Sequence, residues 1–483
     1  MVTFGLTLVT TFGVKVIISN MLFASLTRQS LIQLIGKVFA TIIGLAVVAI
    51  MARGLGPEGF GEYTTVITFL QFAGILADLG LTMTAARALG QDSTDRRELM
   101  GNLLSFRVTT AALAFALAPL VALLLPYSSS VRAGIALTSV ALFLSSVSST
   151  LGAVFQAELK SGWLAAAEIL GRLTLLVGTA LAAARHDGLP SYLWALIAST
   201  IVATIITWVG AQRFIPHTWK INLVVWKKLW LDTWPLALTI ILNLAYFRTD
   251  VIILSLLRPV AEVGIYGASY RLLEVLLTVP AIVGGLVLPL AAGFFERGEK
   301  NKLGELYRGS FDALVSLGLA TVVASSIIGV PLMVALAGPD FTMAGKLLLP
   351  ISLAAAGAFA AGAAGYIIYA MDLQRAMLPY YFGAATLAII GYLMLIPSYT
   401  YWGAAWVTAI INMAMAAAGI KLLQNQGLKL SYERWVKIII SLIALGIGLM
   451  LPAPLLIKLF TGAALWLGAL WLLKLIPHTK SAL

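Results

Sequence analysis

The chain of 483 residues is 60% hydrophobic and 11% charged, and its formal net charge is +12. Soluble domains hold about a quarter charged residues, so this composition excludes a water-soluble globular enzyme. The chain has no cysteine, which also excludes a disulfide scaffold, and we expect an all-α polytopic membrane protein.

The hydrophobic segments have the length of transmembrane helices. A bilayer core about 30 Å thick needs about 20 consecutive apolar residues of helix. By that measure the chain predicts about fourteen spans, most of them separated by short loops with glycine, proline or charge. They centre on 34–52, 63–86, 103–126, 132–157, 162–184, 190–212, 233–257, 265–292, 310–336, 346–371, 377–397, 401–423, 435–451 and 453–473.

Loops and composition divide the chain into five predicted parts. Residues 1–29 are too short and too polar to span, and we expect a leader or an interfacial segment. An N-lobe of helices 1–6 (30–212) and a C-lobe of helices 7–12 (233–423) flank a cytoplasmic linker, 213–232. Helices 13 and 14 and a cytoplasmic tail occupy 424–483. In and just after the linker, Trp226, Trp230 and Trp234 recur every four residues, opposite Lys227 and Lys228, which fits an interfacial helix anchored in lipid.

The distribution of basic residues predicts the orientation of the chain. If the N-terminus is cytoplasmic and the helices alternate, most of the 32 Lys and Arg residues fall in cytoplasmic loops. Both termini are therefore predicted to be cytoplasmic. The positive charge then faces anionic membrane lipid, and a nucleic-acid partner is not needed to explain it. The residues predicted to lie outside are Arg53, Arg132, Arg185, Arg258, Lys346 and Lys458.

Two similar turns indicate an internal repeat. The first reads GLGPEGFGEY from Gly54 to Tyr63, and the second reads LRPVAEVGIY from Leu257 to Tyr266. Each carries a proline, an acidic residue and then Gly-x-Tyr after an outward helix. We therefore predict a parallel repeat of two six-helix lobes around a central cavity, with the last two helices peripheral.

Polar stripes lie on equivalent helices of this repeat. The spacings of three and four hold each stripe to one face of its helix, and a buried charge costs about 3 kcal/mol at the bilayer centre. The stripes predict a wetted cavity, although Ser and Thr alone also serve to join helices. Their members include Lys37, Thr41, Thr64, Thr68, Gln71, Asp78, Thr82, Asn243, Tyr246, Asp250, Tyr270, Arg271 and Glu274.

Four charged residues stand out within helices 7 and 8. Arg271 and Glu274 are three apart and can neutralise each other, whereas Arg248 and Asp250 are two apart and cannot share a helical face. Arg107 lies one turn into helix 3, where its long side chain is expected to snorkel to the cytoplasmic interface.

No enzyme signature is found. The three histidines lie in predicted loops, and neither a metal cluster nor a nucleotide-binding Walker sequence occurs. We therefore expect no catalysis, metal or cofactor.

The motifs resemble those of Wzx-type oligosaccharide flippases. The matching segments are ARGLGPEGFGEY (52–63), ADLGL (77–81), FRTDVIIL (247–254) and GIYGASY (264–270). This family shares a superfamily with MurJ-type lipid II flippases and MATE drug exporters. The resemblance implies a multi-pass protein of the bacterial cytoplasmic membrane that flips undecaprenyl-diphosphate-linked oligosaccharide by alternating access for polysaccharide biosynthesis.

The resemblance also implies roles for the polar residues. Family members use basic cavity residues, and a diphosphate needs hydrated cations to cross hydrocarbon. The implied partners are the lipid-linked oligosaccharide, membrane lipids, and a polysaccharide polymerase or glycosyltransferases. The expected substrate cations are Lys37, Arg248 and Arg271, the expected sugar-stacking residues are Tyr246, Tyr266 and Tyr270, and the expected structural or coupling acids are Asp78, Asp250 and Glu274.

Two related functions stay open at this point. A cation-coupled MATE-type exporter needs acids on its cavity wall, and Asp78, Asp250 and Glu274 satisfy that need. Against it, residues 38–52 hold no carboxylate, and the two additional C-terminal helices favour a flippase by resemblance. A lipid II flippase shares the helix count, but its cavity is expected to hold more arginines.

Overall fold

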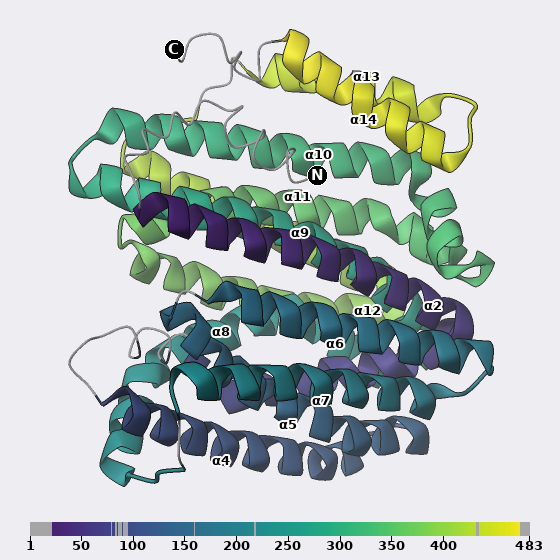
Figure 1. Ribbon diagram of the computed structural model, residues 1–483. Coiled ribbons are helices and arrows are strands. Elements are labelled where there is room, and N and C mark those ends of the chain that lie inside the picture. Colours follow the sequence, from purple (N-terminus) through teal and green to yellow (C-terminus); the bar gives the residue numbers. More distant parts are fainter. Residues whose placement is uncertain are drawn as a thin grey trace. The chain divides into compact units, whose positions relative to one another are not determined.

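Twelve α-helices and one short 3₁₀-helix make up the described part of the chain (Figure 1). The computed structural model describes residues 22–78, 80–82, 85, 89, 95–158, 160–216, 219–430 and 434–473, with side chains apart from those of 22–35, 37–38, 76, 161, 232 and 234–247. The helices are α2 (Leu22–Asp78), α4 (Arg96–Leu123), α5 (Ser129–Ala157), α6 (Ser161–Ala184), α7 (Leu189–Phe214), α8 (Leu223–Leu257), α9 (Val260–Glu296), α10 (Lys300–Ala337), η1 (Pro339–Phe341), α11 (Thr342–Ala370), α12 (Gln374–Asn425), α13 (Trp435–Met450) and α14 (Leu455–Leu472).

The prediction of an all-helical membrane protein is confirmed. Among the described residues, ten helices are long and apolar enough to cross a membrane. Helix α13 is apolar but has 16 residues. Two of these ten helices cover two predicted spans each: α12 covers 377–397 and 401–423, and α2 covers 34–52 and most of 63–86. The number of fourteen crossings stays a prediction.

Helix α2 folds back on itself at Gly56. This residue has φ 64° and ψ −178°, a conformation that glycine adopts without strain, and Pro57 follows it. Between Gly36 and Gly54, close contacts advance along α2 and α6 in the same direction. Beyond the break, α2 lies along α5 and α4 instead, beginning where Val66 contacts Gly134. Because α5 and α6 are consecutive and antiparallel, the two halves of α2 also run in opposite directions.

Helix α12 forms a second hairpin, in which Thr400 is the turning residue, with φ 55° and ψ −141°. Gly391 lies against Val407, and the hydroxyl of Tyr392 is 3.0 Å from that of Thr408. These contacts pair residues at nearly equal distances on either side of Thr400, as in two antiparallel helices. The predicted spans 377–397 and 401–423 are therefore the two arms of one helical hairpin.

Side-chain caps define the starts of several helices. The Asp95 carboxylate accepts hydrogen bonds from the backbone N–H groups of Arg97 and Glu98 and begins α4. Asn222 caps α8 in the same way, and its own N–H donates to the side chain of Asn102 on α4 at 2.8 Å. The end of the predicted linker is thus attached to α4.

The predicted interfacial helix forms the first turns of α8. Trp226 packs edge-on against Phe106 of α4, with ring centroids 5.4 Å apart, so this tryptophan faces protein. Lys227 and Lys228 are exposed, as is Trp230. The prediction that Trp226 faces lipid is wrong, because its ring packs against Phe106 of α4.

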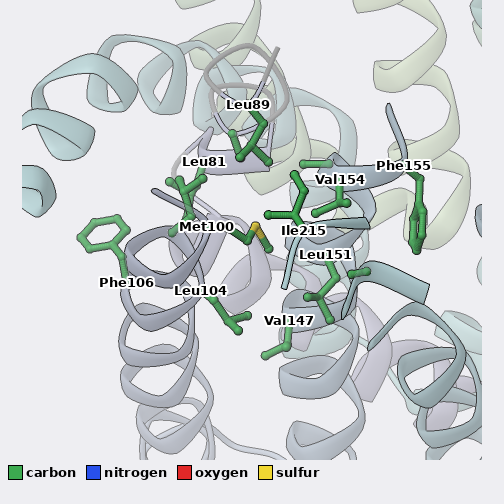
Figure 2. Packing of buried hydrophobic residues seen from close by; sticks show 14 of the residues in the cluster. Leu81, Leu89, Met100, Leu104, Phe106, Val147, Leu151, Val154, Phe155 and Ile215 are labelled. Carbon is green, nitrogen blue, oxygen red and sulfur yellow. The ribbon is translucent and has the colours of Figure 1, made fainter. Parts of the chain in front are cut away.

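The chain divides into two compact units with a boundary after Gly267. In the unit before it, α4 to α8 contact α2 directly. Part of its apolar core joins α4, α5 and the end of α7 through residues such as Met100, Leu151 and Ile215 (Figure 2). In the unit after it, α10 packs on α11 and α11 on α12, while α13 and α14 pack on each other and on α10. The predicted boundaries of the lobes stay a prediction.

Candidate functional site

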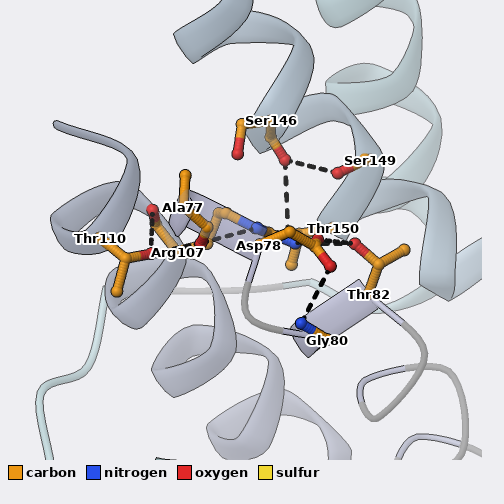
Figure 3. A network of polar contacts seen from close by, with 9 residues as sticks. All are labelled: Ala77, Asp78, Gly80, Thr82, Arg107, Thr110, Ser146, Ser149 and Thr150. Atoms are coloured by element: carbon orange, nitrogen blue, oxygen red, sulfur yellow. Dashed lines mark hydrogen bonds and ion pairs between the residues drawn. The ribbon is translucent and has the colours of Figure 1, made fainter. Parts of the chain in front are cut away.

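A fully buried arginine on α4 connects three helices (Figure 3). The Nε of Arg107 donates a hydrogen bond to Thr150 Oγ1 on α5 at 2.7 Å. One terminal nitrogen donates to the carbonyl of Ala77 on α2 at 3.0 Å. The other donates to Thr82 Oγ1 at 2.7 Å and pairs with the carboxylate of Asp78. The guanidinium therefore has acceptors at all three nitrogens, which offsets the cost of burying its charge.

The acid of this network is held by its own chain. Asp78 is the last residue of α2, and its Oδ1 accepts a hydrogen bond from Thr82 at 2.5 Å. Its Oδ2 accepts from the N–H of Gly80, which has φ 78° and turns the chain back toward the carboxylate. Asp78 was predicted as a structural or coupling acid, and its contacts are those of a group that shapes this turn and neutralises Arg107.

The prediction that Arg107 snorkels to the interface is wrong. Its side chain is 0% exposed, because polar partners from α2 and α5 hold it inside the unit. A long basic side chain extends to the membrane interface when the protein has no hydrogen-bond acceptor closer to it. Here Thr150 and Asp78 are nearer. The sequence did not indicate that Arg107 holds a buried polar network together, or that Thr150 is one of its partners.

A second buried acid lies near the end of α8. Asp250 is fully buried, and its Oδ2 accepts a hydrogen bond from the hydroxyl of Tyr266 on α9 at 2.5 Å. Its Oδ1 accepts from the N–H of Val251 at 2.7 Å. Tyr266 is itself fully buried, so its ring has no exposed face for stacking on a sugar in this conformation. This bond fixes the last turns of α8 against the first turns of α9.

An ion pair lies on α9 in the other unit. Arg271 Nη1 is 2.8 Å from Glu274 Oε2, and the two side chains are 21% and 25% exposed. The two residues are three apart on one helical face, as the sequence indicated. Tyr270 beside them is buried. A partly exposed guanidinium beside an acid is a group that an incoming phosphate can engage, because the phosphate competes with the carboxylate for the same donors.

The other predicted site residues fall in different places. Arg248 is half-buried on α8, and the buried Asp250 two residues later lies on a different face, as expected from helical geometry. The side chains of Lys37 and Tyr246 lie outside the described residues. The structure therefore brings together Asp78 with Arg107, Asp250 with Tyr266 and Arg271 with Glu274. Their roles in substrate binding or coupling stay predictions.

Metal-binding chemistry finds no support in the part of the chain that the structure describes. No group of three or more His, Asp or Glu side chains there is placed to hold a metal ion. The polar groups in the helices instead form pairs and small networks of opposite charge.

Comparison with known proteins gives both a family and a fold. The model of a family described as polysaccharide biosynthesis protein matches residues 26–293. A curated protein of Shigella flexneri, named as an O-antigen transporter, is 42% identical over 65 residues, which are 14% of this chain. The chain spans about 15% of the length of that relative.

Solved transporters share the arrangement of helices. The lipid II flippase MurJ in an inward closed conformation aligns with a TM-score of 0.77 at 12% identity, covering 91% of this chain and 98% of that one. An inward-facing multidrug resistance MATE family transporter of the MOP superfamily aligns with a TM-score of 0.68 at 12% identity, covering 82% and 98%. A MATE transporter of Vibrio cholerae gives 0.58 at 14% identity, covering 83% and 96%. The chain therefore has a fold like that of these transporters.

Proposed function

Because the chain belongs to the polysaccharide biosynthesis protein family, a family of membrane transporters, we propose that it flips undecaprenyl-diphosphate-linked oligosaccharide from the inner to the outer leaflet of the bacterial cytoplasmic membrane. The observation that carries this proposal is the family match over 26–293, which includes α4 to α8 entire and most of α2 and α9. The likeness to a protein named as an O-antigen transporter supports the same class of cargo.

The chemistry of the cargo explains why a protein is needed. A diphosphate carries charge that hydrocarbon cannot solvate, whereas its polyprenyl tail is at home in the bilayer. The transporter must therefore shelter the head group while the tail stays in lipid. Half-buried arginines within apolar helices, such as Arg248 and Arg271, are suited to this task because a guanidinium binds phosphate oxygens through two parallel hydrogen bonds.

The architecture that we propose has fourteen crossings built from two related sets of six helices, with α13 and α14 added. The internal packing of the two units supports this repeat. In the first unit α4 packs on α5 and α5 on α7, and in the second α10 packs on α11 and α11 on α12. Val66 on α2 contacts Gly134 on α5, and Ser269 on α9 correspondingly donates to the Ala344 carbonyl on α11 at 2.8 Å.

Complementation tests the proposed function. The gene is expressed in a bacterium that lacks its own O-antigen flippase, and surface polysaccharide is measured together with lipid-linked oligosaccharide at the inner leaflet. We expect surface polysaccharide to return and the lipid-linked intermediate to fall. Rescue of a strain depleted of its lipid II flippase, or drug resistance without any polysaccharide, would overturn the assignment.

Substitutions at the Arg271–Glu274 ion pair of α9 test whether Arg271 binds the phosphate of the substrate. Arg271→Ala should abolish most export at normal abundance, and Arg271→Lys should keep part of it, because lysine retains charge but loses bidentate geometry. Glu274→Gln leaves the cation in place, so we expect it to keep export. The double swap Arg271→Glu with Glu274→Arg restores an ion pair. If it restores export as well as folding, the pair is structural and Arg271 does not bind phosphate.

A further inference from the structure

Three aromatic rings form one cluster where α5 ends, α6 begins and α7 ends. The ring of Phe155 lies parallel to that of Trp163 with centroids 6.3 Å apart, and it meets the ring of Phe214 edge-on at 6.2 Å. Phe155 also belongs to the apolar core of this unit (Figure 2). A β-carbon on Gly210 would be 2.7 Å from Trp163 and 2.8 Å from Phe155, so this glycine makes room for both rings.

Two basic side chains lie over this aromatic cluster. The guanidinium carbon of Arg213 is 5.3 Å from the centroid of the Trp163 ring. The Nζ of Lys160 is 5.9 Å from the centroid of the Phe214 ring. Both distances are within the range of a cation–π interaction. Arg213 lies in the last turn of α7, whereas Lys160 precedes α6 and its N–H donates to the Phe155 carbonyl at 2.8 Å. Two separate segments of the chain therefore hold their cations over one set of rings.

The positive charge of these two side chains is not neutralised by a neighbouring acid. The acid nearest to Lys160 in the sequence is Glu158, which pairs with Arg96 at 2.8 Å. Within the described part of the chain, neither Lys160 nor Arg213 forms an ion pair. Both side chains are exposed. Because the rings cover one side of each cation, the other side is left for an anion.

Exposed apolar stripes on α6 and α7 lead away from the cluster. On α6, Leu170 and Val177 follow the tryptophan at intervals of seven residues, share its face, and are 47% and 58% exposed. On α7, Ile205 and Val209 precede Arg213 at intervals of four and are 56% and 44% exposed. The contact of the arginine with the tryptophan joins the two stripes at the cluster. In a membrane protein such stripes face acyl chains, and the one on α6 extends about 20 Å.

We propose that these residues form a binding site for one anionic phospholipid, with its phosphate on Lys160 and Arg213 and its two acyl chains along the two apolar stripes. The ammonium and the guanidinium donate hydrogen bonds to phosphate oxygens. A zwitterionic phospholipid carries an ammonium group of its own, which the two cations repel, so the site selects a lipid with net negative charge. The distribution of basic residues predicts that both segments are cytoplasmic, which places the site in the inner leaflet.

Titration of phospholipid into the purified full chain tests the site. Native mass spectrometry of the protein in detergent counts the phosphatidylglycerol or phosphatidylcholine molecules that each chain binds. We expect the wild type to bind phosphatidylglycerol more tightly than phosphatidylcholine. Lys160→Gln with Arg213→Gln should lower the affinity for phosphatidylglycerol about 30-fold, which is about fivefold for each basic residue. Equal affinity of the wild type for the two lipids would overturn the proposal.

A second pair of basic residues supplies the matched control. Lys227 and Lys228 are exposed in the first turns of α8, and among the described side chains no ring lies beneath them. Lys227→Gln with Lys228→Gln removes the same amount of charge and should change the affinity for phosphatidylglycerol by less than about twofold. A loss as large as that of the Lys160 and Arg213 variant would show that the lipid responds to net charge alone, and the site would be rejected.

Photo-crosslinking locates the bound lipid and separates it from the lipid carrier of the proposed cargo. Phosphatidylglycerol with a diazirine on one acyl chain should label residues 163–177 of α6 and 205–213 of α7, and the double glutamine variant should lose this label. Undecaprenyl phosphate should not displace the label, because its single chain covers one stripe where a phospholipid covers two. Labelling of other helices instead, or displacement by equimolar undecaprenyl phosphate, would contradict the proposal. These measurements do not involve export, so their failure leaves the proposed function intact.

Discussion

At the scale of single residues, the buried charges of this protein are compensated locally. Arg107 is buried with four side-chain or carbonyl acceptors around it, and Asp250 is buried beneath the hydroxyl of Tyr266. Removing one member of such a set leaves the other charged or polar and without its partner in a dry place, which costs far more than the pair itself contributes. These residues are therefore expected to matter for stability before they matter for transport.

Asp78→Asn should destabilise the protein, because Arg107 then keeps its charge without a neutralising acid. Removing one partner of a fully buried pair costs about 3–5 kcal/mol, and the part-exposed Asp78 places this case at about 2–3 kcal/mol. The loss is measured as folded, detergent-soluble protein remaining after heating. Glu98→Gln removes an exposed acid 3.7 Å from Lys220 and is expected to cost less than about 1 kcal/mol. Equal melting of the two variants would contradict the network's role.

The sequence predicted these residues unevenly. A charged residue inside a long apolar segment can be recognised from the sequence alone. This is how Asp78, Asp250, Arg271 and Glu274 could be predicted. The pairing of Arg271 with Glu274 could also be predicted, since it lies within one helix. The pairing of Arg107 with Asp78 was not predicted, because the two residues are 29 positions apart and lie on different helices. Helical periodicity does not indicate which helices pack against each other. Both residues lie near the same predicted membrane face, which is the signal that was available.

At the scale of elements, the hairpins of α2 and α12 show which chain reversals the local sequence determines. The Gly56-Pro57 pair predicts a turn, and α2 is interrupted at Gly56 in the structure. The break in α12 lies at Thr400, three residues after Pro397, although Thr400 has no special freedom at φ 55°. Its conformation is imposed by the packing of the two arms, at Gly403 against the Leu395 carbonyl for example, and tertiary contacts of this kind cannot be read from propensity.

Gly403→Ala should weaken the α12 hairpin, because its β-carbon would lie 2.6 Å from the Leu395 carbonyl oxygen. The arms would have to separate locally, at a cost of about 1–3 kcal/mol. Gly383→Ala in the same helix meets nothing within 4 Å and should be neutral or stabilising by up to about 1 kcal/mol through helix propensity. Thermal melting of both variants in detergent checks the difference, and an unchanged Gly403→Ala would argue against tight packing at this turn.

At the scale of the whole molecule, composition was enough to predict an all-helical membrane protein, and motif resemblance was enough to predict its family. The contacts between helices were not predictable in the same way. The two Gly-x-Tyr turns were recognised as similar, yet nothing in one chain alone indicates that Gly61 and Gly264 touch, as they do in the structure. Residues at equivalent positions of a repeat can be in contact or far apart. The structure, and not the sequence, distinguishes these two arrangements.

Orientation is a prediction at this scale that the native lack of cysteine makes simple to test. Asp340 is exposed in η1, between α10 and α11, and Gln426 is exposed after α12. With both termini cytoplasmic, Asp340→Cys should react with a membrane-impermeant maleimide in intact cells, and Gln426→Cys only after permeabilisation. The reverse pattern would invert the predicted topology.

The Arg107 network also has a consequence for how the chain is made. Asp78 leaves the ribosome 29 residues ahead of Arg107, about 1.5–6 s earlier at ordinary rates of synthesis. When α4 is inserted, the carboxylate that pairs with its arginine has already been synthesised, so the ion pair offsets part of the insertion penalty of about 3 kcal/mol. Thr150 follows later with α5 and completes the set of acceptors. The order of residues along the chain thus schedules the assembly of its first helices.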